Sequence, residues 1–321
     1  MTRFAFLFLI LSGITAALAE DYPSRPVMLV VPIGGGGPLD TTARLLAAKL
    51  GDAMGKPFVV ENRPGGNTIV GTMTVAKADP DGHTLLVAPN ASLTTNVAIF
   101  RKLPYDPQKD FIPIAVLASV PFLLVTGPAL PVTQLLQLIA EAKNKPGQLT
   151  FASTGIGTVP HLAGEMLKSM AGIQMTHVPY RGLAPVLADV MGGQISMAFV
   201  DLAGAMPLVS AGKLHAVGVS SKHRLAELPN VPTIAEGGLP NFEAVGWNMI
   251  LAPANTPPAV IEKLHAAVVT AMAQPDIQER MKTLGLIADA SPGVPELRNF
   301  IAAEINRWGA AVRSAGIEGS E

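Results

Sequence analysis

The chain has 321 residues, of which 49% are hydrophobic, 5% aromatic and 15% charged. This composition is typical of one or two globular domains with a large core and excludes a disordered chain. The 23 Lys and Arg residues balance the 24 Asp and Glu residues, so we expect no nucleic-acid partner. The absence of cysteine excludes disulfides, thiolate nucleophiles, Cys-ligated zinc and iron–sulfur clusters.

The first nineteen residues predict a cleaved secretory signal peptide. Arg3 precedes an apolar run from Phe4 to Leu11, and Ala17-Leu18-Ala19 supplies the small residues of a cleavage site. A transmembrane anchor is the alternative, but this stretch is shorter than the roughly 20 residues that span hydrocarbon. We therefore expect residues 1–19 to be removed and the mature chain to be secreted and soluble.

Short apolar runs alternate with helical patterns along the rest of the chain, which is typical of an α/β protein with parallel sheets. After a first strand at 27–31, a helix with Leu45, Leu46 and Leu50 on its buried stripe is expected to end near Gly51. Further strands are predicted at 58–61, 84–88, 112–118, 122–125, 149–153, 175–178, 195–200 and 214–220. Further helices are predicted from a loop at 62–68 to about residue 78, and at 132–143, 161–171, 184–191 and 203–211.

The C-terminal part is predicted to be helical. Thr256 is a candidate cap of one helix, with Pro257 at the first helical position. Apolar residues three or four positions apart mark the buried stripe of the last helix: Leu297, Ile301, Ile305, Trp308 and Val312.

Two loops join a strand directly to a helix through small residues, which is where α/β proteins bind ligands. The first spans Gly34 to Asp40 and the second Ser153 to His161. Their glycines bring backbone N–H groups close to a helix N-terminus, an arrangement that suits a carboxylate or a phosphate. Tight turns without a ligand are the structural alternative for either loop.

The chain matches none of the cofactor and enzyme motifs that a sequence of this class suggests, so we expect no cofactor. Leu39 and Pro160 occupy the third glycine position of a dinucleotide fingerprint, and Leu214 follows Gly212-Lys213 where a phosphate loop needs Ser or Thr. Phe151 replaces the first glycine of a hydrolase elbow around Ser153. The six histidines show no spacing typical of metal ligands, so no metal is expected.

Three titratable residues remain candidates for the site. His161 lies at the end of the second loop, where the alternative role is to cap the helix. Asp40 begins a helix, where Asp is favoured on dipole grounds alone. Asp201 ends a strand before another helix, so it either caps that helix or faces a cleft and receives a donor group of a ligand.

The chain resembles the tripartite tricarboxylate transporter substrate-binding proteins, also called the Bug family of extracytoplasmic solute receptors. The matching segments follow one another in order along nearly the whole mature chain. They are Tyr22–Pro26, Val31–Pro32, Gly36–Asp40, Ala43–Arg44, Val60–Gly65, Val75–Gly82, Leu103–Asp106, Phe111, Ser153–Gly157, His161–Glu165, His177–Gly182, Asp189, Gly192–Gln194, Leu228–Thr233, Ala252–Ala254 and Thr256–Pro257.

This resemblance implies a periplasmic receptor of Venus flytrap architecture, similar to the type II periplasmic binding proteins, with two α/β lobes built on mainly parallel sheets. Residues 20–124 and 245–321 are expected to form lobe 1, and residues 125–244 lobe 2. The ligand would be a small organic carboxylate held by backbone amides, hydroxyls and waters, without an arginine clamp. The implied ligand-binding residues are Gly36, Asp40, Asn90, Ser92, Thr154, Gly157, Thr158, His161 and Asp201.

The expected partners are a dicarboxylate, aromatic carboxylate or acidic amino acid and the membrane permease subunits of a tripartite tricarboxylate-type transporter; the receptor is expected to be a monomer. Two alternatives stay open at this point. One is a secreted α/β enzyme that uses Asp40 or Asp201 with His161 as acid and base. The other is a sensor module for a signalling partner. The chain also departs from the family at Asn67-Thr68, where glycine is frequent, and this change concerns a loop near the mouth of the cleft.

Overall fold

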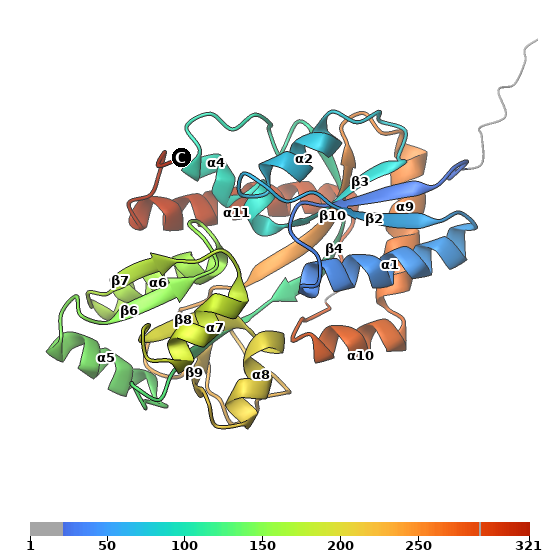
Figure 1. Ribbon diagram of the computed structural model, residues 1–321. Helices are drawn as coiled ribbons and strands as arrows, with labels where there is room; N and C mark the ends of the chain where they lie inside the picture. Colours follow the sequence, from blue (N-terminus) through green and yellow to red (C-terminus); the bar gives the residue numbers. More distant parts are fainter. Residues whose placement is uncertain (1–21, 289) are drawn as a thin grey trace, which may run out of the picture.

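Two five-stranded sheets, each flanked by helices, form the two lobes of the protein (Figure 1). This computed structural model describes residues 22–288 and 290–321, and the predicted signal peptide lies outside the described residues. The strand order is β2-β1-β3-β10-β4 in the first sheet and β7-β6-β8-β5-β9 in the second. The predicted two-lobed α/β fold is confirmed.

In the first sheet, β1 pairs in parallel with β2 and β3, whereas β10 lies antiparallel between β3 and β4. Every residue of β10 is buried, because helices cover both faces of the sheet at its centre. The strands are β1 (Val27–Val31), β2 (Phe58–Asn62), β3 (Thr84–Pro89), β4 (Phe111–Val120) and β10 (Gly246–Pro253).

The second sheet repeats this plan, with one antiparallel strand in an otherwise parallel sheet. Here β6 pairs in parallel with β7 and β8, and β5 lies antiparallel between β8 and β9. The strands are β5 (Phe122–Thr126), β6 (Thr150–Ser153), β7 (Thr176–Pro179), β8 (Met197–Asp201) and β9 (His215–Val219).

The helices pack their apolar faces onto the two sheets. On the first sheet, α1, α9 and α10 share one core with β1 and β4, and α2 packs into a second core on the other face. On the second sheet, α5 and α6 cover one face and α7 and α8 the other. The helices are α1 (Pro38–Met54), α2 (Ile69–Ala76), α3 (Asn90–Leu93), α4 (Thr95–Ile99), α5 (Leu135–Asn144), α6 (Val159–Ala171), α7 (Leu183–Met191), α8 (Leu202–Ser210), α9 (Pro258–Met272), α10 (Pro275–Thr283) and α11 (Val294–Ser314).

Two predicted helix ends are wrong. The first helix continues past Gly51 to Met54, and Gly55 ends it in the left-handed conformation with φ 72°. Gly51 is tolerated inside the helix because the cost of glycine there is only about 1 kcal/mol relative to alanine. Thr256 does not cap α9, since Pro257 holds the N-cap position and the Thr256 hydroxyl donates to the carbonyl of Pro253.

The chain passes from one sheet to the other at Pro121, between β4 and β5, and returns just before β10. The predicted lobe boundary after residue 124 falls within β5, so we propose Pro121 and Val245 as the two crossing points. Helix α11 connects the lobes a third time, because Leu297 packs in the first-lobe core and Trp308 in the second.

A buried carboxylate fastens this third connection. The indole N–H groups of Trp247 in β10 and Trp308 in α11 both donate to Oε2 of Glu304, at 2.7 and 2.9 Å. Arg307 donates to Oε1 of Glu304 and to the carbonyl of Glu243, which precedes the return crossing. The only two tryptophans of the chain therefore meet beside the return crossing.

Candidate functional site

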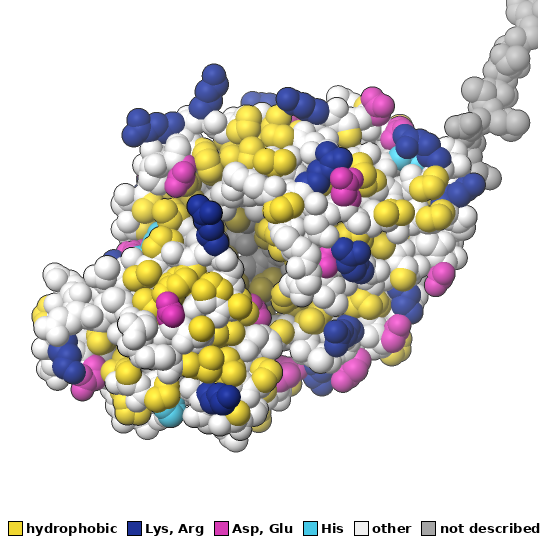
Figure 2. All heavy atoms as spheres, in the orientation of Figure 1, with side chains coloured by type: hydrophobic (Ala, Val, Ile, Leu, Met, Phe, Trp, Pro, Cys, Tyr) yellow, Lys and Arg dark blue, Asp and Glu magenta, His cyan; other side chains and the backbone are white. Residues whose placement is uncertain are grey.

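A cavity of about 840 Å³ lies between the two lobes, and the space-filling view shows the hollow that separates them (Figure 2). Most of the loops that form it connect the end of a strand to the start of a helix, as expected for an α/β protein. Its lining residues are Pro32, Ile33, Gly34, Pro64, Gly65, Gly66, Asn67, Thr68, Pro89, Asn90, Ala91, Val120, Phe122, Thr154, Thr158, Val159, Pro160, Arg181, Gly182, Gly246 and Asn248.

Three helices begin at this cavity. The N-cap residues of α2, α6 and α7 are Thr68, Thr158 and Gly182, and all three line it. None of these three residues caps its helix with a side-chain hydrogen bond. The first N–H groups of a helix lack intrahelical partners and carry a partial positive charge. At α2 the N–H groups of Ile69 and Val70 donate to the carbonyls of Gly66 and Gly65, so the unpaired donors belong mainly to α6 and α7. Their convergence favours an anionic ligand in the cavity.

Asn90 adds a side-chain donor to these backbone groups. It is only 4% exposed, and its Nδ2 atom has no hydrogen-bond partner among the described residues. Leaving a buried amide donor unpaired costs about 1–3 kcal/mol. Gly246 lies next to it, and a Cβ there would come within 3.2 Å of Asn90 Oδ1. An acceptor oxygen of a ligand in the cavity would complete the hydrogen bonding of Asn90.

The first-lobe wall of the cavity, residues 64–68 and 89–91, is supported from behind by neutral polar groups. Ser92 donates to the hydroxyl of Thr68 at 2.8 Å, and the amide of Asn96 donates to the carbonyl of Asn67 at 2.8 Å. The hydroxyl of Tyr105 donates to the carbonyl of Ser92 at 2.6 Å. Burial raises the pKa of Tyr105 to about 12, so this network stays neutral at ordinary pH.

The second-lobe wall, residues 154–160, is supported by two stacked imidazoles. Gly157 N–H donates to Nδ1 of His161 at 3.0 Å, and Nε2 of His177 lies 2.7 Å from the hydroxyl of Ser153. The two rings stack with their centroids 3.8 Å apart. Desolvation, with His177 and then Lys168 nearby, lowers the pKa of His161 to about 3. Desolvation and the charge of Lys168 lower the pKa of His177 to about 4, so both rings are neutral at pH 7.

The structure brings some of the predicted site residues to the cavity and leaves others outside it. Asn90, Thr154 and Thr158 line the cavity. Ser92, Gly157 and His161 lie behind its walls and support them through the hydrogen bonds above. The contact of Gly157 N–H with His161 is the helix-start role left open by the sequence. Gly36, Asp40 and Asp201 are absent from the lining.

Asp40 instead fastens the first glycine loop to its surroundings. Its carboxylate accepts hydrogen bonds from Gly36 N–H, Arg44 and the amide of Asn62. Burial acts to raise the pKa of Asp40, but these hydrogen bonds outweigh it, and the pKa is lowered. The Asp40 carboxylate therefore stays ionised and stabilises the conformation of the first glycine loop.

Asp201 is the side-chain cap of α8. Its Oδ1 atom accepts from the N–H of Gly204 at 2.9 Å, and this capping was the alternative to a ligand contact. Burial raises the pKa of Asp201, and the hydrogen bond from Gly204 offsets only part of that effect.

Sequence reasoning missed several residues at the cavity, among them Asn67, Thr68, Arg181 and Asn248. The departure from the family at Asn67-Thr68 was the available signal for the first two. Arg181 was quoted only as part of a matching segment, and no arginine was expected at the ligand. It is the one charged residue among those that line the cavity within the described chain.

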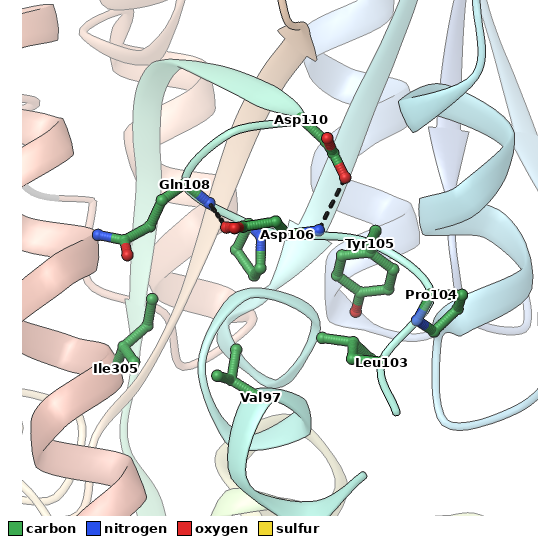
Figure 3. Close-up of a pocket in the computed structure, with 9 residues that line it drawn as sticks. Val97, Leu103, Pro104, Tyr105, Asp106, Gln108, Asp110 and Ile305 are labelled. Atoms are coloured by element: carbon green, nitrogen blue, oxygen red, sulfur yellow. Dashed lines mark hydrogen bonds between the residues drawn. The ribbon is translucent and has the colours of Figure 1, made fainter. Parts of the chain in front are cut away.

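A second hollow, of about 550 Å³, lies on the first lobe between residues 103–110 and α11 (Figure 3). Its two carboxylates are used internally: Asp110 accepts from the N–H of Asp106, and Asp106 accepts from the N–H of Gln108 and pairs with Lys109. These bonds shape the loop and leave no convergent donors for a ligand.

Residues 22–288 and 290–321 contain neither a metal site nor a membrane-spanning helix. No group of three or more His, Asp and Glu side chains is placed to hold a metal ion. No helix in this part of the chain is long and apolar enough to cross a membrane. The hydrogen bond between Ser153 and His177 resembles a nucleophile and its base, but Ser153 is fully buried and does not line the cavity.

Comparisons with known proteins identify the family. The profile described as "Tripartite tricarboxylate transporter family receptor" matches residues 42–317. An R. palustris protein solved with adipate is 35% identical, with a TM-score of 0.85 over 93% of this chain and 99% of that chain. The periplasmic binding protein BugD is 32% identical, with a TM-score of 0.82 over 92% of this chain and 99% of its own.

A third solved structure, MatC from Rhodopseudomonas palustris with bound malate, is 34% identical, with a TM-score of 0.80 over 91% of this chain and 100% of that chain. The family and these relatives are solute-binding receptors, which confirms the prediction of a receptor over that of an enzyme. The chain therefore belongs to the tripartite tricarboxylate transporter family of receptors, of the Bug type.

Proposed function

We propose that this receptor captures a small organic carboxylate in the cavity between its lobes and delivers it, unchanged, to the permease of a tripartite tricarboxylate-type transporter. The observation that carries the proposal is the unpaired, buried Nδ2 of Asn90 at a cavity onto which three helix N-termini without a side-chain cap open. Donors without partners at a cavity are suited to an acceptor-only group such as a carboxylate.

The energetics are sufficient for a transport receptor. Each hydrogen bond to a charged acceptor contributes about 1.5–3 kcal/mol, so three or four preorganised donors support micromolar binding after the cost of association. Similar proteins solved with adipate and with malate are consistent with this ligand class.

We further propose that Asn90, Thr154 and Thr158 contact the ligand directly. Ser92, Gly157 and His161 act by holding the walls of the cavity in place, and Gly36, Asp40 and Asp201 act by shaping their own loops. This division follows from which residues line the cavity and which hydrogen-bond behind it.

The proposed location is the periplasm, with the receptor acting as a monomer. The signal-like first nineteen residues support export, and a similar protein, BugD, is described as periplasmic. The crossings at Pro121 and Val245 would allow the lobes to close on a ligand, and the permease would distinguish the closed form from the open one.

Thermal unfolding with a panel of organic carboxylates tests the function. A ligand at 100 times its Kd stabilises the receptor by about 2.7 kcal/mol, which shifts the midpoint by several degrees. The panel contains mono-, di- and tricarboxylates, aromatic carboxylates and acidic amino acids, with neutral amides of the same skeletons as controls. Stabilisation by carboxylates alone supports the proposal, and stabilisation by none of them contradicts it.

Two variants test the site. Asn90→Ala removes the unpaired donor, so we expect the Kd of the best carboxylate to rise at least tenfold. Asp201→Asn retains a good N-cap of α8 away from the cavity lining and is expected to leave the Kd within about twofold. Calorimetric titration measures both, and equal effects of the two variants would contradict the site.

A further inference from the structure

Arg181 differs from every other residue that lines the cavity. It is the single charged residue among them in the described chain, and its side chain is exposed. It makes no side-chain hydrogen bond or ion pair with any described residue, whereas arginines such as Arg44 and Arg307 pair with carboxylates. A full positive charge is thus left unpaired at the edge of a binding cavity.

The residues next to Arg181 shape the loop that carries it. Asp189, the carboxylate closest in sequence, accepts a hydrogen bond from the hydroxyl of Tyr180. The N–H of Tyr180 donates to the carbonyl of Ser153 at 2.9 Å, which fastens the loop to β6. Gly182 has φ 107°, a conformation that favours glycine, and it turns the chain into α7 immediately after Arg181.

The polarity of the cavity changes with depth. Its most buried polar residues, Asn90 and Asn248, are each 4% exposed and neutral. Apolar side chains such as Val120, Phe122 and Val159 also line it. Arg181, together with the exposed Gly182, lies at the solvent side. A ligand in this cavity meets neutral donors and apolar surface at its buried side and a cation at its solvent side.

We propose that Arg181 is the specificity-determining residue of the receptor and pairs with a second anionic group at the far end of the ligand. A matching ligand is an α,ω-dicarboxylate with an apolar chain between its two acid groups. Arginine presents a planar fork of N–H groups that matches a carboxylate in bidentate geometry. This inference rests on the proposed function, since it assigns the second end of a ligand whose first carboxylate binds at Asn90.

Matched pairs of ligands separate the two ends. The probes are the unbranched dicarboxylates of four to seven carbons and the monomethyl ester of each, which keeps one carboxylate and the chain but removes the second charge. Calorimetric titration of the wild-type receptor at low salt gives a Kd for every probe. We expect the best dicarboxylate to bind at least tenfold more tightly than its own ester, with the ratio shrinking at high salt.

Substitution of Arg181 then assigns the preference. Arg181→Gln is expected to weaken the dicarboxylate at least tenfold, leave the ester within about twofold, and bring the ratio of the two Kd values near one. Arg181→Lys keeps the charge without the fork and is expected to fall between. The matched control is Arg298→Gln, an exposed arginine of α11 outside the cavity lining, which should bind like the wild type.

Each outcome decides one of the two proposals. Equal affinities of dicarboxylate and ester in the wild type, or a ratio that survives Arg181→Gln, would overturn the role of Arg181 and leave the carboxylate receptor intact. Failure of the wild type to bind any of these dicarboxylates also overturns this inference. The proposed function itself fails only if the wider carboxylate panel gives no binding either.

Discussion

The two walls of the cavity are stabilised from behind by different kinds of side chain. Behind the first-lobe wall, hydroxyl and amide groups of Thr68, Ser92, Asn96 and Tyr105 hydrogen-bond to one another and to the backbone. Behind the second-lobe wall, two stacked imidazoles take this place. Both arrangements fix loops that contain two glycines each.

The difference lies in how the supports respond to protons. No group of the first support titrates between pH 3 and 10, because the pKa of Tyr105, its one ionisable member, is raised to about 12. The second support must stay uncharged, and its histidines are neutral only because desolvation lowers their pKa values. The support of the first wall is therefore independent of pH, whereas the support of the second wall depends on its histidines remaining neutral.

The largest effect is expected from Gly71→Ala, which breaks the first-lobe wall mechanically. A Cβ at Gly71 would lie 2.7 Å from Cα of Pro32 and 2.8 Å from the carbonyl oxygen of Arg63. Both are backbone atoms that no rotamer change can move. We expect α2 to shift away from β1, a loss of about 3 kcal/mol in the free energy of unfolding, and weaker ligand binding.

Urea unfolding of Gly71→Ala beside Gly34→Ala checks this expectation. A Cβ at Gly34 would have no atom within 4 Å, and the φ of Gly34 is not positive, so its substitution should change stability by less than about 0.5 kcal/mol. Equal stability of the two variants would show that α2 does not depend on the close approach of Gly71 to Pro32.

The second-largest effect is expected at the second-lobe wall, where acid should lower the stability of the folded protein. The folded pKa values of His161 and His177 lie near 3 and 4, below the usual 6.5. As pH falls below 6.5, the histidines of the unfolded chain bind protons that the folded chain does not, so stability is lost between pH 6.5 and about 3. For the buried His161 this amounts to about 2 kcal/mol at pH 5.

His161→Asn isolates this contribution, because asparagine keeps an acceptor for Gly157 N–H and does not titrate. Urea unfolding at pH 7 and pH 5 should show a smaller acid loss in the variant than in the wild type. The groups that face the imidazole pair are Lys168, whose charge opposes protonation, and Glu165, 4.0 Å from His161 Nε2. An unchanged pH dependence would place the acid sensitivity of the receptor elsewhere.

The fold was predictable from the sequence to the extent that it is local. Buried strands such as β1 and β3 are continuous apolar runs, and their ends were predicted to within one residue. Strand β10 was missed, although all eight of its residues are buried, because its partners β3 and β4 lie far upstream. Local periodicity does not encode which distant segment inserts between two strands, or in which direction.

The site was predictable to the level of its loops and not of its side chains. The rule that ligands bind where strands end and helices begin points to Thr154 and Thr158, which line the cavity. It cannot distinguish Asn90, which lines the cavity, from Ser92, two residues later, which supports Thr68 from behind. The sequence shows that both residues are polar, but only the packing of the folded chain determines which of the two lines the cavity.

A smaller effect should distinguish a residue that supports the wall from one that contacts the ligand. Ser92→Ala removes the hydrogen bond to Thr68 but leaves the Ser92 carbonyl as the acceptor of Tyr105. We expect a loss of about 1 kcal/mol in the free energy of unfolding, equal at pH 7 and pH 5, and a rise in ligand Kd smaller than that of Asn90→Ala. Ser169→Ala, at an exposed position of α6, is the control. A larger loss of affinity in Ser92→Ala than in Asn90→Ala would make Ser92 the contact residue.

The smallest effect is expected at two buried threonines that adjoin the first support, and for one of them stability should rise. Thr94 and Thr95 are neighbours and both fully buried, but Thr94 Oγ1 donates to the carbonyl of Asn90, whereas Thr95 Oγ1 has no partner among the described residues. Thr95→Val removes a buried hydroxyl that makes no hydrogen bond, so the free energy of unfolding should rise by about 0.5–1 kcal/mol. Thr94→Val removes the hydroxyl that donates to the Asn90 carbonyl, so the free energy of unfolding should fall by about 1 kcal/mol. Urea unfolding of both variants measures the difference directly. If Thr95→Val is destabilised as much as Thr94→Val, then Thr95 bonds to a group that the folded chain alone does not supply, such as a bound water, and the Thr95 hydroxyl also belongs to the neutral support.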